Sequence, residues 1–201
     1  MKKAVNPPSR EGRSLPLRKA CNVRCFGGVP LRALIRDVPG FPKPGIIFKD
    51  ITPLLLQPDA LRHAAKMILN EFSGEKIDVV AGIESRGFVV GTAVALELGA
   101  GLALVRKKGK LPWKKLAESY QLEYGTDTVE IHSDAVKPGQ KVLVIDDLLA
   151  TGGTAAATCR LVENLKGELV GCGFIIELSS LNGRRKLSDY RVVSLIQYDS
   201  E

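Results

Sequence analysis

The spacing of apolar residues along the chain predicts alternating helices and strands. From Asp59 to Phe72, apolar side chains recur every three or four residues, which is the period of a helix with one buried face. Beyond this helix, short apolar runs of strand length alternate with helical segments. The predicted strands are IDVVAGI (77–83), GLALVR (101–106), VEIH (129–132), KVLVIDD (141–147), LVGCGFIIEL (169–178) and VVSLIQY (192–198). The predicted helices among them are FVVGTAVALELG (88–99) and TAAATCRLVENLKG (154–167).

This alternation is typical of an α/β domain. Strands that are apolar almost throughout are buried on both faces, as in a parallel sheet covered by helices. We therefore predict a mainly parallel, twisted sheet flanked by helices, within a single domain over residues 31–201. The turn-rich segment around Asp37–Pro44 predicts irregular structure, because it is dense in proline and glycine.

Charge sets the first thirty residues apart from the rest. The formal net charge is +7, but residues 1–30 hold seven Lys and Arg against one Glu, and the remainder holds 22 basic and 21 acidic residues. The nearly neutral remainder argues against a nucleic-acid-binding surface. We interpret residues 1–30 as a basic, disordered leader, although an organelle transit peptide or an overlong gene start explains its composition equally well. No run approaches the ~18 apolar residues of a membrane helix, and the four cysteines are expected to be free thiols in a reducing, cytoplasmic compartment.

Three polar loops follow predicted strands and are candidates for a ligand site. They are Glu84–Gly87, Arg106–Lys110 and Asp146–Thr154. In a parallel sheet the ligand binds outside the carboxyl ends of the strands, so we expect these loops to lie together.

The loop ATGGT predicts a cradle for a phosphate. Gly152 and Gly153 allow close backbone approach, Thr151 and Thr154 add hydroxyl donors, and the next helix points its free N–H groups at the loop. Neither the Walker A pattern nor the dinucleotide fingerprint is present. Asp146 and Asp147 precede the loop at the expected end of a buried strand, where two adjacent carboxylates need a partner. Vicinal ribose hydroxyls beside a phosphate would satisfy both features.

The aspartate pair and the ATGGT loop together resemble the phosphoribosyl-pyrophosphate (PRPP) motif of type I phosphoribosyltransferases. Four further segments resemble, in order, the motifs of the family's adenine-specific members. They are FPKPGIIFKDITPLL (41–55), AGIESRGFVVG (81–91), LVRKKGKLPW (104–113) and YQLEYG (120–125). The resemblance covers roughly residues 35–200. It implies a Rossmann-like core, a small N-terminal hood over about 35–56, and a flexible lid loop over about 107–125.

The resemblance also implies an activity and residue roles. The family transfers ribose 5-phosphate from PRPP to N9 of adenine and releases AMP and pyrophosphate, with Mg²⁺ carried by PRPP near Asp146 rather than held by a protein site. Asp146 and Asp147 would hold the ribose hydroxyls, and the loop would hold the 5′-phosphate through Ala150, Thr151, Gly152, Gly153 and Thr154. The cations and donors implied for pyrophosphate are Ser85, Arg86, Arg106, Lys107 and Lys110. The implied catalytic residues are Glu123, Tyr124 and Arg86, with Glu123 taking the N9-side proton or orienting the purine.

Adenine recognition is implied for the GIIFKD segment. Ile47 and Lys49 match backbone-contact positions, and Phe48 is a stacking candidate. Family members are commonly homodimers, so a second copy of the chain is the expected protein partner, with no nucleic acid or membrane. Two alternatives stay open: a phosphoribosyltransferase for hypoxanthine, guanine or xanthine, and a PRPP-sensing regulator. The regulator is disfavoured because residues 1–30 are too short for a DNA-binding module.

Overall fold

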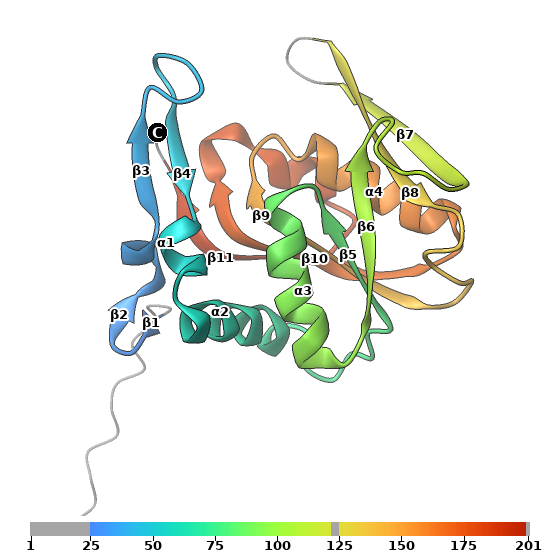
Figure 1. Ribbon diagram of the computed structural model, residues 1–201, viewed down its shortest axis with the longest axis horizontal. Coiled ribbons are helices and arrows are strands. Elements are labelled where there is room, and N and C mark those ends of the chain that lie inside the picture. Colours follow the sequence, from blue (N-terminus) through green and yellow to red (C-terminus); the bar gives the residue numbers. More distant parts are fainter. Residues whose placement is uncertain (1–24, 122–124, 200–201) are drawn as a thin grey trace, which may run out of the picture.

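The structure is a computed structural model that describes residues 25–121 and 125–199 (Figure 1). Its strands are β1 (Cys25–Phe26), β2 (Val29–Pro30), β3 (Arg36–Pro39), β4 (Ile47–Asp50), β5 (Val79–Ile83), β6 (Gly101–Lys107), β7 (Lys115–Gln121), β8 (Thr126–His132), β9 (Lys141–Leu149), β10 (Glu168–Leu178) and β11 (Val192–Tyr198). Its helices are α1 (Thr52–Leu55), α2 (Pro58–Asn70), α3 (Arg86–Leu98) and α4 (Gly153–Asn164). Three 3₁₀ turns span Leu31–Leu34, Ser179–Leu181 and Gly183–Leu187.

Seven strands form the central sheet, in the order β11-β10-β9-β5-β6-β8-β7. The five strands from β11 to β6 are parallel, whereas β8 pairs antiparallel with both β6 and β7. Strand β5 is buried at every position, as expected for a central strand that is covered on both faces. The predicted α/β fold with a mainly parallel sheet is confirmed.

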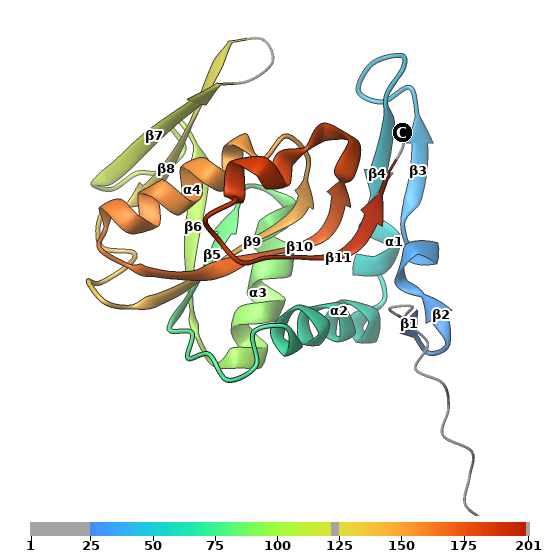
Figure 2. The same cartoon turned by 180° about the vertical axis from the view of Figure 1, so that it is seen from behind.

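Helices cover the two faces of the sheet and create two cores. On the face toward the viewer in Figure 1, α2 and α3 pack with Val80, Leu143 and Ile175 of the sheet. On the opposite face, seen in Figure 2, α4 packs with Val144 and Phe174. Neighbouring residues of one strand thus point into different cores, because side chains alternate across a sheet.

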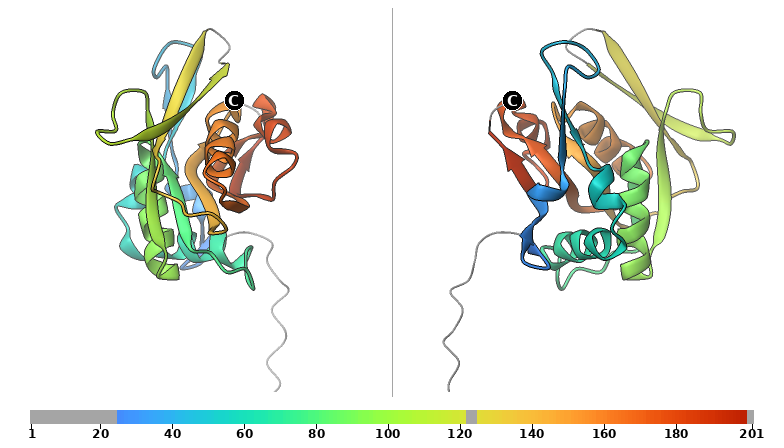
Figure 3. Two further views of the ribbon diagram at one scale, coloured as in Figure 1. Left: turned by 90° about the vertical axis from the view of Figure 1, so that its right-hand side faces the viewer. Right: turned by 60° about the vertical axis from the view of Figure 1, so that its left-hand side comes forward.

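Two antiparallel hairpins rise at the edge where the parallel strands end. One is β3–β4, which belongs to the expected hood, and the other is β7–β8 (Figures 1 and 3). The loops after β5, β6 and β9 follow the carboxyl ends of parallel strands, so the fold gathers the three polar loops at one edge of the sheet.

Several boundaries differ from those expected. Residues 25–30 were assigned to the leader, but they form the β1–β2 hairpin, and Phe26 packs against His63 of α2 at a ring distance of 5.8 Å. Residues 36–39 are a strand rather than irregular, because β3 pairs along its length with β4. The segment expected as a lid contains strand β7, which pairs with β8 and packs on α4. Of the helices that the structure describes, not one is long and apolar enough to cross a bilayer.

Candidate functional site

Asp146 and Asp147 lie within β9 rather than at its end, because the strand continues to Leu149. Successive side chains of a strand point to opposite faces, so the two carboxylates have different surroundings. Asp146 Oδ1 accepts a hydrogen bond of 2.9 Å from the backbone N–H of Asp147. Burial and the neighbouring charge of Asp147 raise the pKa of Asp146 well above its usual range. The site therefore holds a carboxyl group in need of a cation or hydrogen-bond donors.

Asp147 has such a partner in Arg86, the first residue of α3. Arg86 Nε donates a hydrogen bond to Asp147 Oδ2, and the Asp147 side chain is only 6% exposed. The Arg86 guanidinium carbon also lies 4.9 Å from the centre of the Phe48 ring in β4. One side chain thus connects the strand expected to bind adenine with the strand expected to bind ribose. Space is tight here, since a Cβ on Gly87 would lie 2.6 Å from Asp146 Oδ1.

The ATGGT loop connects β9 to α4 and has the features of an anion site. Gly152 adopts a φ of +74°, in the left-handed region that favours glycine. A Cβ at Gly152 would lie 2.3 Å from the carbonyl oxygen of Gly183, so the loop is packed against the backbone of the last 3₁₀ turn. A pocket of about 80 Å³ is lined by Asp146 and residues 148–155. The first N–H groups of α4 have no partner within the helix and are free to bind an anion here.

The Glu84 carboxylate binds Arg106 and Lys110, two of the cations expected to hold pyrophosphate. The carboxylate accepts hydrogen bonds from Arg106 Nε at 3.3 Å, from the backbone N–H of Lys107 at 3.0 Å, and from Lys110 Nζ. Burial of Glu84 opposes ionisation, but these bonds hold the pKa of Glu84 below its usual range. The next residue, Ser85, is exposed before α3 and makes no capping bond, and the Glu84–Ser85 peptide bond is cis.

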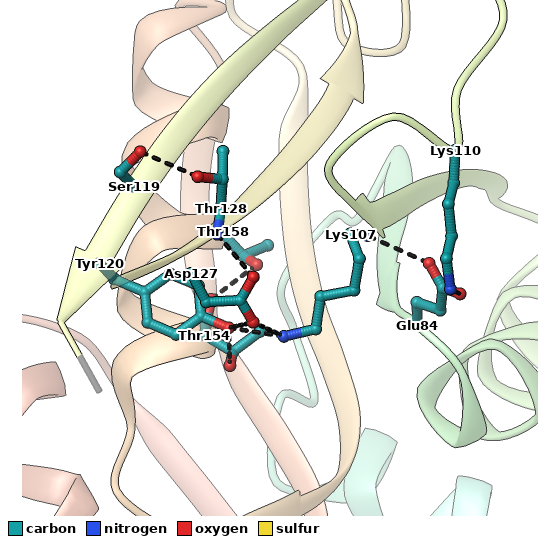
Figure 4. A network of polar contacts seen from close by, with 9 residues as sticks. All are labelled: Glu84, Lys107, Lys110, Ser119, Tyr120, Asp127, Thr128, Thr154 and Thr158. Atoms are coloured by element: carbon teal, nitrogen blue, oxygen red, sulfur yellow. Dashed lines mark hydrogen bonds and ion pairs between the residues drawn. The ribbon is translucent and has the colours of Figure 1, made fainter. Parts of the chain in front are cut away.

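Lys107, the remaining expected cation after β5 and β6 apart from Arg86, points toward β7 and β8 instead. Its Nζ donates to the hydroxyl of Tyr120 at 2.8 Å and to Asp127 Oδ2, while Thr154 Oγ1 donates to the same hydroxyl at 2.9 Å (Figure 4). Burial disfavours the ammonium ion, but the bonds to Asp127 and Tyr120 hold the pKa of Lys107 above its usual value. Lys107 is therefore charged at neutral pH.

The hood residues divide into two groups. Phe48 faces the site through Arg86 and makes an edge-to-face contact with Phe41 at 5.2 Å. The Lys49 side chain is buried elsewhere, with Nζ 2.9 Å from Asp37 Oδ1 and 4.3 Å from the centre of the Tyr198 ring. Ile47 is half-buried opposite Pro39 in the hairpin. The side chain of Lys49 is thus engaged within the protein, and backbone contact of Ile47 and Lys49 with a base stays a prediction.

Two expected catalytic residues, Glu123 and Tyr124, lie outside the described residues. No role was predicted for Tyr120, Asp127, Glu84 or Gly183, although Glu84 and Tyr120 lie in segments that the sequence singled out. The alternation in KLAESYQ carried a signal for Tyr120, because Leu116, Glu118 and Tyr120 share the less exposed face of β7. Nothing in the sequence signalled Gly183, which lies far along the chain from the loop that it touches.

The donor set fits a magnesium ion that is held mainly by a phosphate ligand. Among residues 25–121 and 125–199, no three His, Cys, Asp or Glu side chains cluster as a metal cage. Asp146 lines the pocket beside the ATGGT loop with one carboxyl group. Mg²⁺ is commonly bound through one or two carboxylates together with substrate phosphates and water, and Asp146 suits that role.

Comparison with known proteins agrees with this geometry. The family model described as phosphoribosyl transferase domain matches residues 50–201, which is well over half of the chain. The chain belongs to the phosphoribosyltransferase family. A family member from Trichlorobacter lovleyi, named adenine phosphoribosyltransferase, is 55% identical over 168 residues that cover 84% of this chain and 98% of that protein. One of the same name from Acaryochloris marina is 56% identical over 84% of this chain and 99% of its own length.

Solved structures of phosphoribosyltransferases share the fold as well as the sequence. The adenine phosphoribosyltransferase of Rhodothermus marinus is 56% identical with a TM-score of 0.81, over 84% of this chain and 96% of that one. The Saccharomyces cerevisiae enzyme, solved with adenine and an imino-altritol bisphosphate, is 42% identical with a TM-score of 0.78, over 82% and 96% of the two chains. The Trypanosoma brucei enzyme, solved with AMP, pyrophosphate and ribose 5-phosphate, is 25% identical with a TM-score of 0.75, over 86% and 82%.

Proposed function

We infer that this chain transfers ribose 5-phosphate from PRPP to N9 of adenine, forming AMP and pyrophosphate. The observation that carries this inference is the contact chain from Phe48 through Arg86 to Asp147, beside the ATGGT loop. It brings a ring suited to stacking on a base next to carboxylates suited to a ribose. Relatives more than half identical to the chain are named adenine phosphoribosyltransferase, which supports the same conclusion.

The PRPP end is assigned to β9 and the loop after it. The loop from Ala150 to Thr154 binds the 5′-phosphate through backbone N–H groups and hydroxyls at the start of α4. Asp146 and Asp147 accept hydrogen bonds from the ribose hydroxyls. As the bond from C1′ to pyrophosphate breaks, positive charge develops on the ribose, and the two carboxylates stabilise it.

The leaving pyrophosphate is assigned to the loops after β5 and β6. Hydrogen-bond donors and positive charge, where negative charge accumulates on the leaving group, come from Ser85, Arg86, Arg106, Lys107 and Lys110. Arg106 and Lys110 share Glu84, so the carboxylate orients both cations toward one region. Mg²⁺ bound to PRPP near Asp146 would neutralise part of the phosphate charge.

Adenine is assigned to β4. Phe48 stacks on the purine, and backbone groups of Ile47 and Lys49 read its N1 and 6-amino edge. Glu123 takes the N9-side proton or orients the base, with Tyr124 next to it. The segment over about 107–125 closes over the substrates and excludes water, which would otherwise hydrolyse PRPP.

A homodimer is the proposed assembly. On α3, Val89 and Leu96 are exposed on one face, and Leu102 and Leu104 are exposed on the adjacent β6. Leu96 is 77% exposed. Several exposed apolar side chains on neighbouring elements suit an interface with another protein. We place the assembly in the cytoplasm, where the buried thiols Cys159 and Cys172, 3.5 Å apart, stay reduced.

The test is a nucleotide-formation assay with the purified chain, PRPP and Mg²⁺. Adenine, hypoxanthine, guanine and xanthine are supplied in separate reactions, and products are identified by chromatography. We expect AMP and pyrophosphate from adenine alone. Turnover of a 6-oxopurine in place of adenine would favour another purine phosphoribosyltransferase, and no turnover with any base would overturn the proposed enzyme activity.

A further inference from the structure

The hydroxyl of Tyr120 joins two parts of the site that are assigned to opposite ends of PRPP. It accepts hydrogen bonds from Lys107 Nζ at 2.8 Å and from Thr154 Oγ1 at 2.9 Å, and it donates to Asp127 Oδ2 at 3.1 Å (Figure 4). A phenol has one hydrogen and two lone pairs, so all of its hydrogen-bonding capacity is used. The Tyr120 side chain is buried, and its ring packs on Gly153. A Cβ added to Gly153 would lie 2.8 Å from Tyr120 Cδ2.

Both donors that Tyr120 holds are donors that the substrate needs. A threonine hydroxyl has one hydrogen, so Thr154 can donate either to Tyr120 or to a phosphate, but not to both. Lys107 is held by Tyr120 and by Asp127, so two of its three ammonium hydrogens are already engaged. A phosphate that binds the Thr154 hydroxyl must therefore replace a hydrogen bond within the protein, and one that takes more than a single hydrogen from Lys107 must do the same.

We propose that Tyr120 is a positioning residue that acts as a latch, competing through its hydroxyl for Lys107 and Thr154 and so easing release of both products. This inference rests on the proposed function, which places the 5′-phosphate at Thr154 and pyrophosphate at Lys107. When AMP and pyrophosphate leave, Lys107 and Thr154 again donate hydrogen bonds to the phenol oxygen. Neither donor is then left without an acceptor, and the bond from Thr154 again connects α4 to strand β7.

The test compares Tyr120→Phe with the wild type by calorimetric titration. Ribose 5-phosphate and pyrophosphate are titrated separately into the full chain, with Mg²⁺ present. Phenylalanine keeps the ring on Gly153 and removes only the competing oxygen. A neutral hydrogen bond is worth about 0.5–1.5 kcal/mol, so each ligand should bind roughly two- to tenfold more tightly to Tyr120→Phe. Loss of folded protein cannot mimic a gain in affinity.

Ser119→Ala is the matched control. Ser119 lies next to Tyr120 on β7, and its hydroxyl bonds to Thr128 at 3.0 Å across the hairpin, away from Lys107 and Thr154 (Figure 4). This variant should bind both ligands as the wild type does. Thr154→Val provides a second background, in which Tyr120→Phe should still tighten pyrophosphate binding but should no longer tighten ribose 5-phosphate binding.

The outcomes separate the latch from the proposed function. Tighter binding of both ligands by Tyr120→Phe, absent in Ser119→Ala, supports the latch. Unchanged or weaker binding of both ligands by Tyr120→Phe overturns it and leaves the proposed function standing. A wild-type chain that binds neither ribose 5-phosphate nor pyrophosphate overturns both.

Discussion

Arg86 and Asp147 are hydrogen-bonded across 61 positions of the chain, from the first residue of α3 to the last third of β9. The Asp147 carboxylate is almost completely buried, whereas the Arg86 side chain is 37% exposed. The pair fixes the start of α3 against the strand that leads into the ATGGT loop. Loss of this pair should therefore lower the free energy of unfolding and also weaken the binding of PRPP.

Removal of Arg86 leaves the Asp147 carboxylate buried without its cation. We expect Arg86→Ala to lower the free energy of unfolding by about 1–3 kcal/mol, the cost of leaving such a group unsatisfied. Urea unfolding of wild type and variant measures the difference. Arg62→Ala is the control, because the Arg62–Glu97 pair is exposed and such pairs contribute about 0–1 kcal/mol. Equal losses for both variants would contradict the role given to the buried pair.

Gly152 is predicted to be indispensable for the shape of the phosphate loop. Gly152→Ala adds a Cβ that would lie 2.3 Å from the Gly183 carbonyl oxygen, and it strains a φ of +74°. Gly139→Ala is the control, since Gly139 has a φ of +78° with open space around it. Both variants should lose about 1–2 kcal/mol from backbone strain. Only Gly152→Ala should also raise the KM for PRPP, on the order of tenfold for 1.4 kcal/mol of lost binding.

Kinetics with varied PRPP and saturating adenine distinguish the two glycine variants. An unchanged KM for PRPP in Gly152→Ala would mean that the loop adjusts without consequence for the phosphate. A raised KM in Gly139→Ala would mean that strain anywhere in the fold has the same effect.

Glu130 makes stability depend on pH through a buried ion pair. Its carboxylate accepts hydrogen bonds from Lys115 Nζ at 2.8 Å and from the Gly109 N–H at 2.9 Å. Burial opposes ionisation, but these bonds hold the pKa of Glu130 below its ordinary value of 4.5. The stabilisation is therefore complete above about pH 4.5 and is lost as the pH falls through the lower pKa of the folded state.

Glu130→Gln should be less stable than the wild type at neutral pH, by about 1–3 kcal/mol, and the difference should shrink at acid pH. Urea unfolding at neutral pH and near pH 4 measures both quantities. Glu75→Gln is the control, because Glu75 and Lys141 are 3.6 Å apart and both side chains are far more exposed than that of Glu130. A difference that stays constant with pH would exclude the Glu130 carboxylate as its origin.

The sequence predicted the parts of the fold that have a clear period. Strand β5 and helix α2 were predicted because an apolar run and an amphipathic period can be recognised in the sequence itself. Strand β3 was missed because Pro39 and Gly40 give it the composition of a turn, while its pairing with β4 is a tertiary contact. The end of β9 was placed too early because two carboxylates suggested a loop, although pairing with β10 extends the strand.

The sequence predicted the part of the candidate site whose residues are consecutive in the chain. Asp146, Asp147 and the ATGGT loop form one continuous motif, so their proximity needed no structure. Arg86 meets Asp147, and Lys107 meets Tyr120 and Thr154, only because parallel strands place their ends at one edge. Arg86 and Lys107 were predicted from the sequence to bind pyrophosphate. Their hydrogen bonds to Asp147 and Tyr120 could be found only in the three-dimensional structure.

The exposed face of α3 and β6 should mediate dimer formation. We expect Leu96→Asp to shift the protein toward monomer in analytical ultracentrifugation, because a charge in an apolar interface is costly to bury. Trp113→Asp is the control, since Trp113 is 61% exposed on the turn between β6 and β7. A wild-type monomer, or a Leu96→Asp variant that dimerises as well as the wild type, would contradict this interface.

The most direct test of the central claim is a competition between two bases. The chain is supplied with PRPP, Mg²⁺ and equal concentrations of adenine and hypoxanthine, and nucleotides and pyrophosphate are quantified from the same reaction. The assigned site predicts AMP and pyrophosphate in equal amounts, with adenine strongly preferred over hypoxanthine. Formation of IMP as the main product, or pyrophosphate without any nucleotide, would contradict adenine transfer.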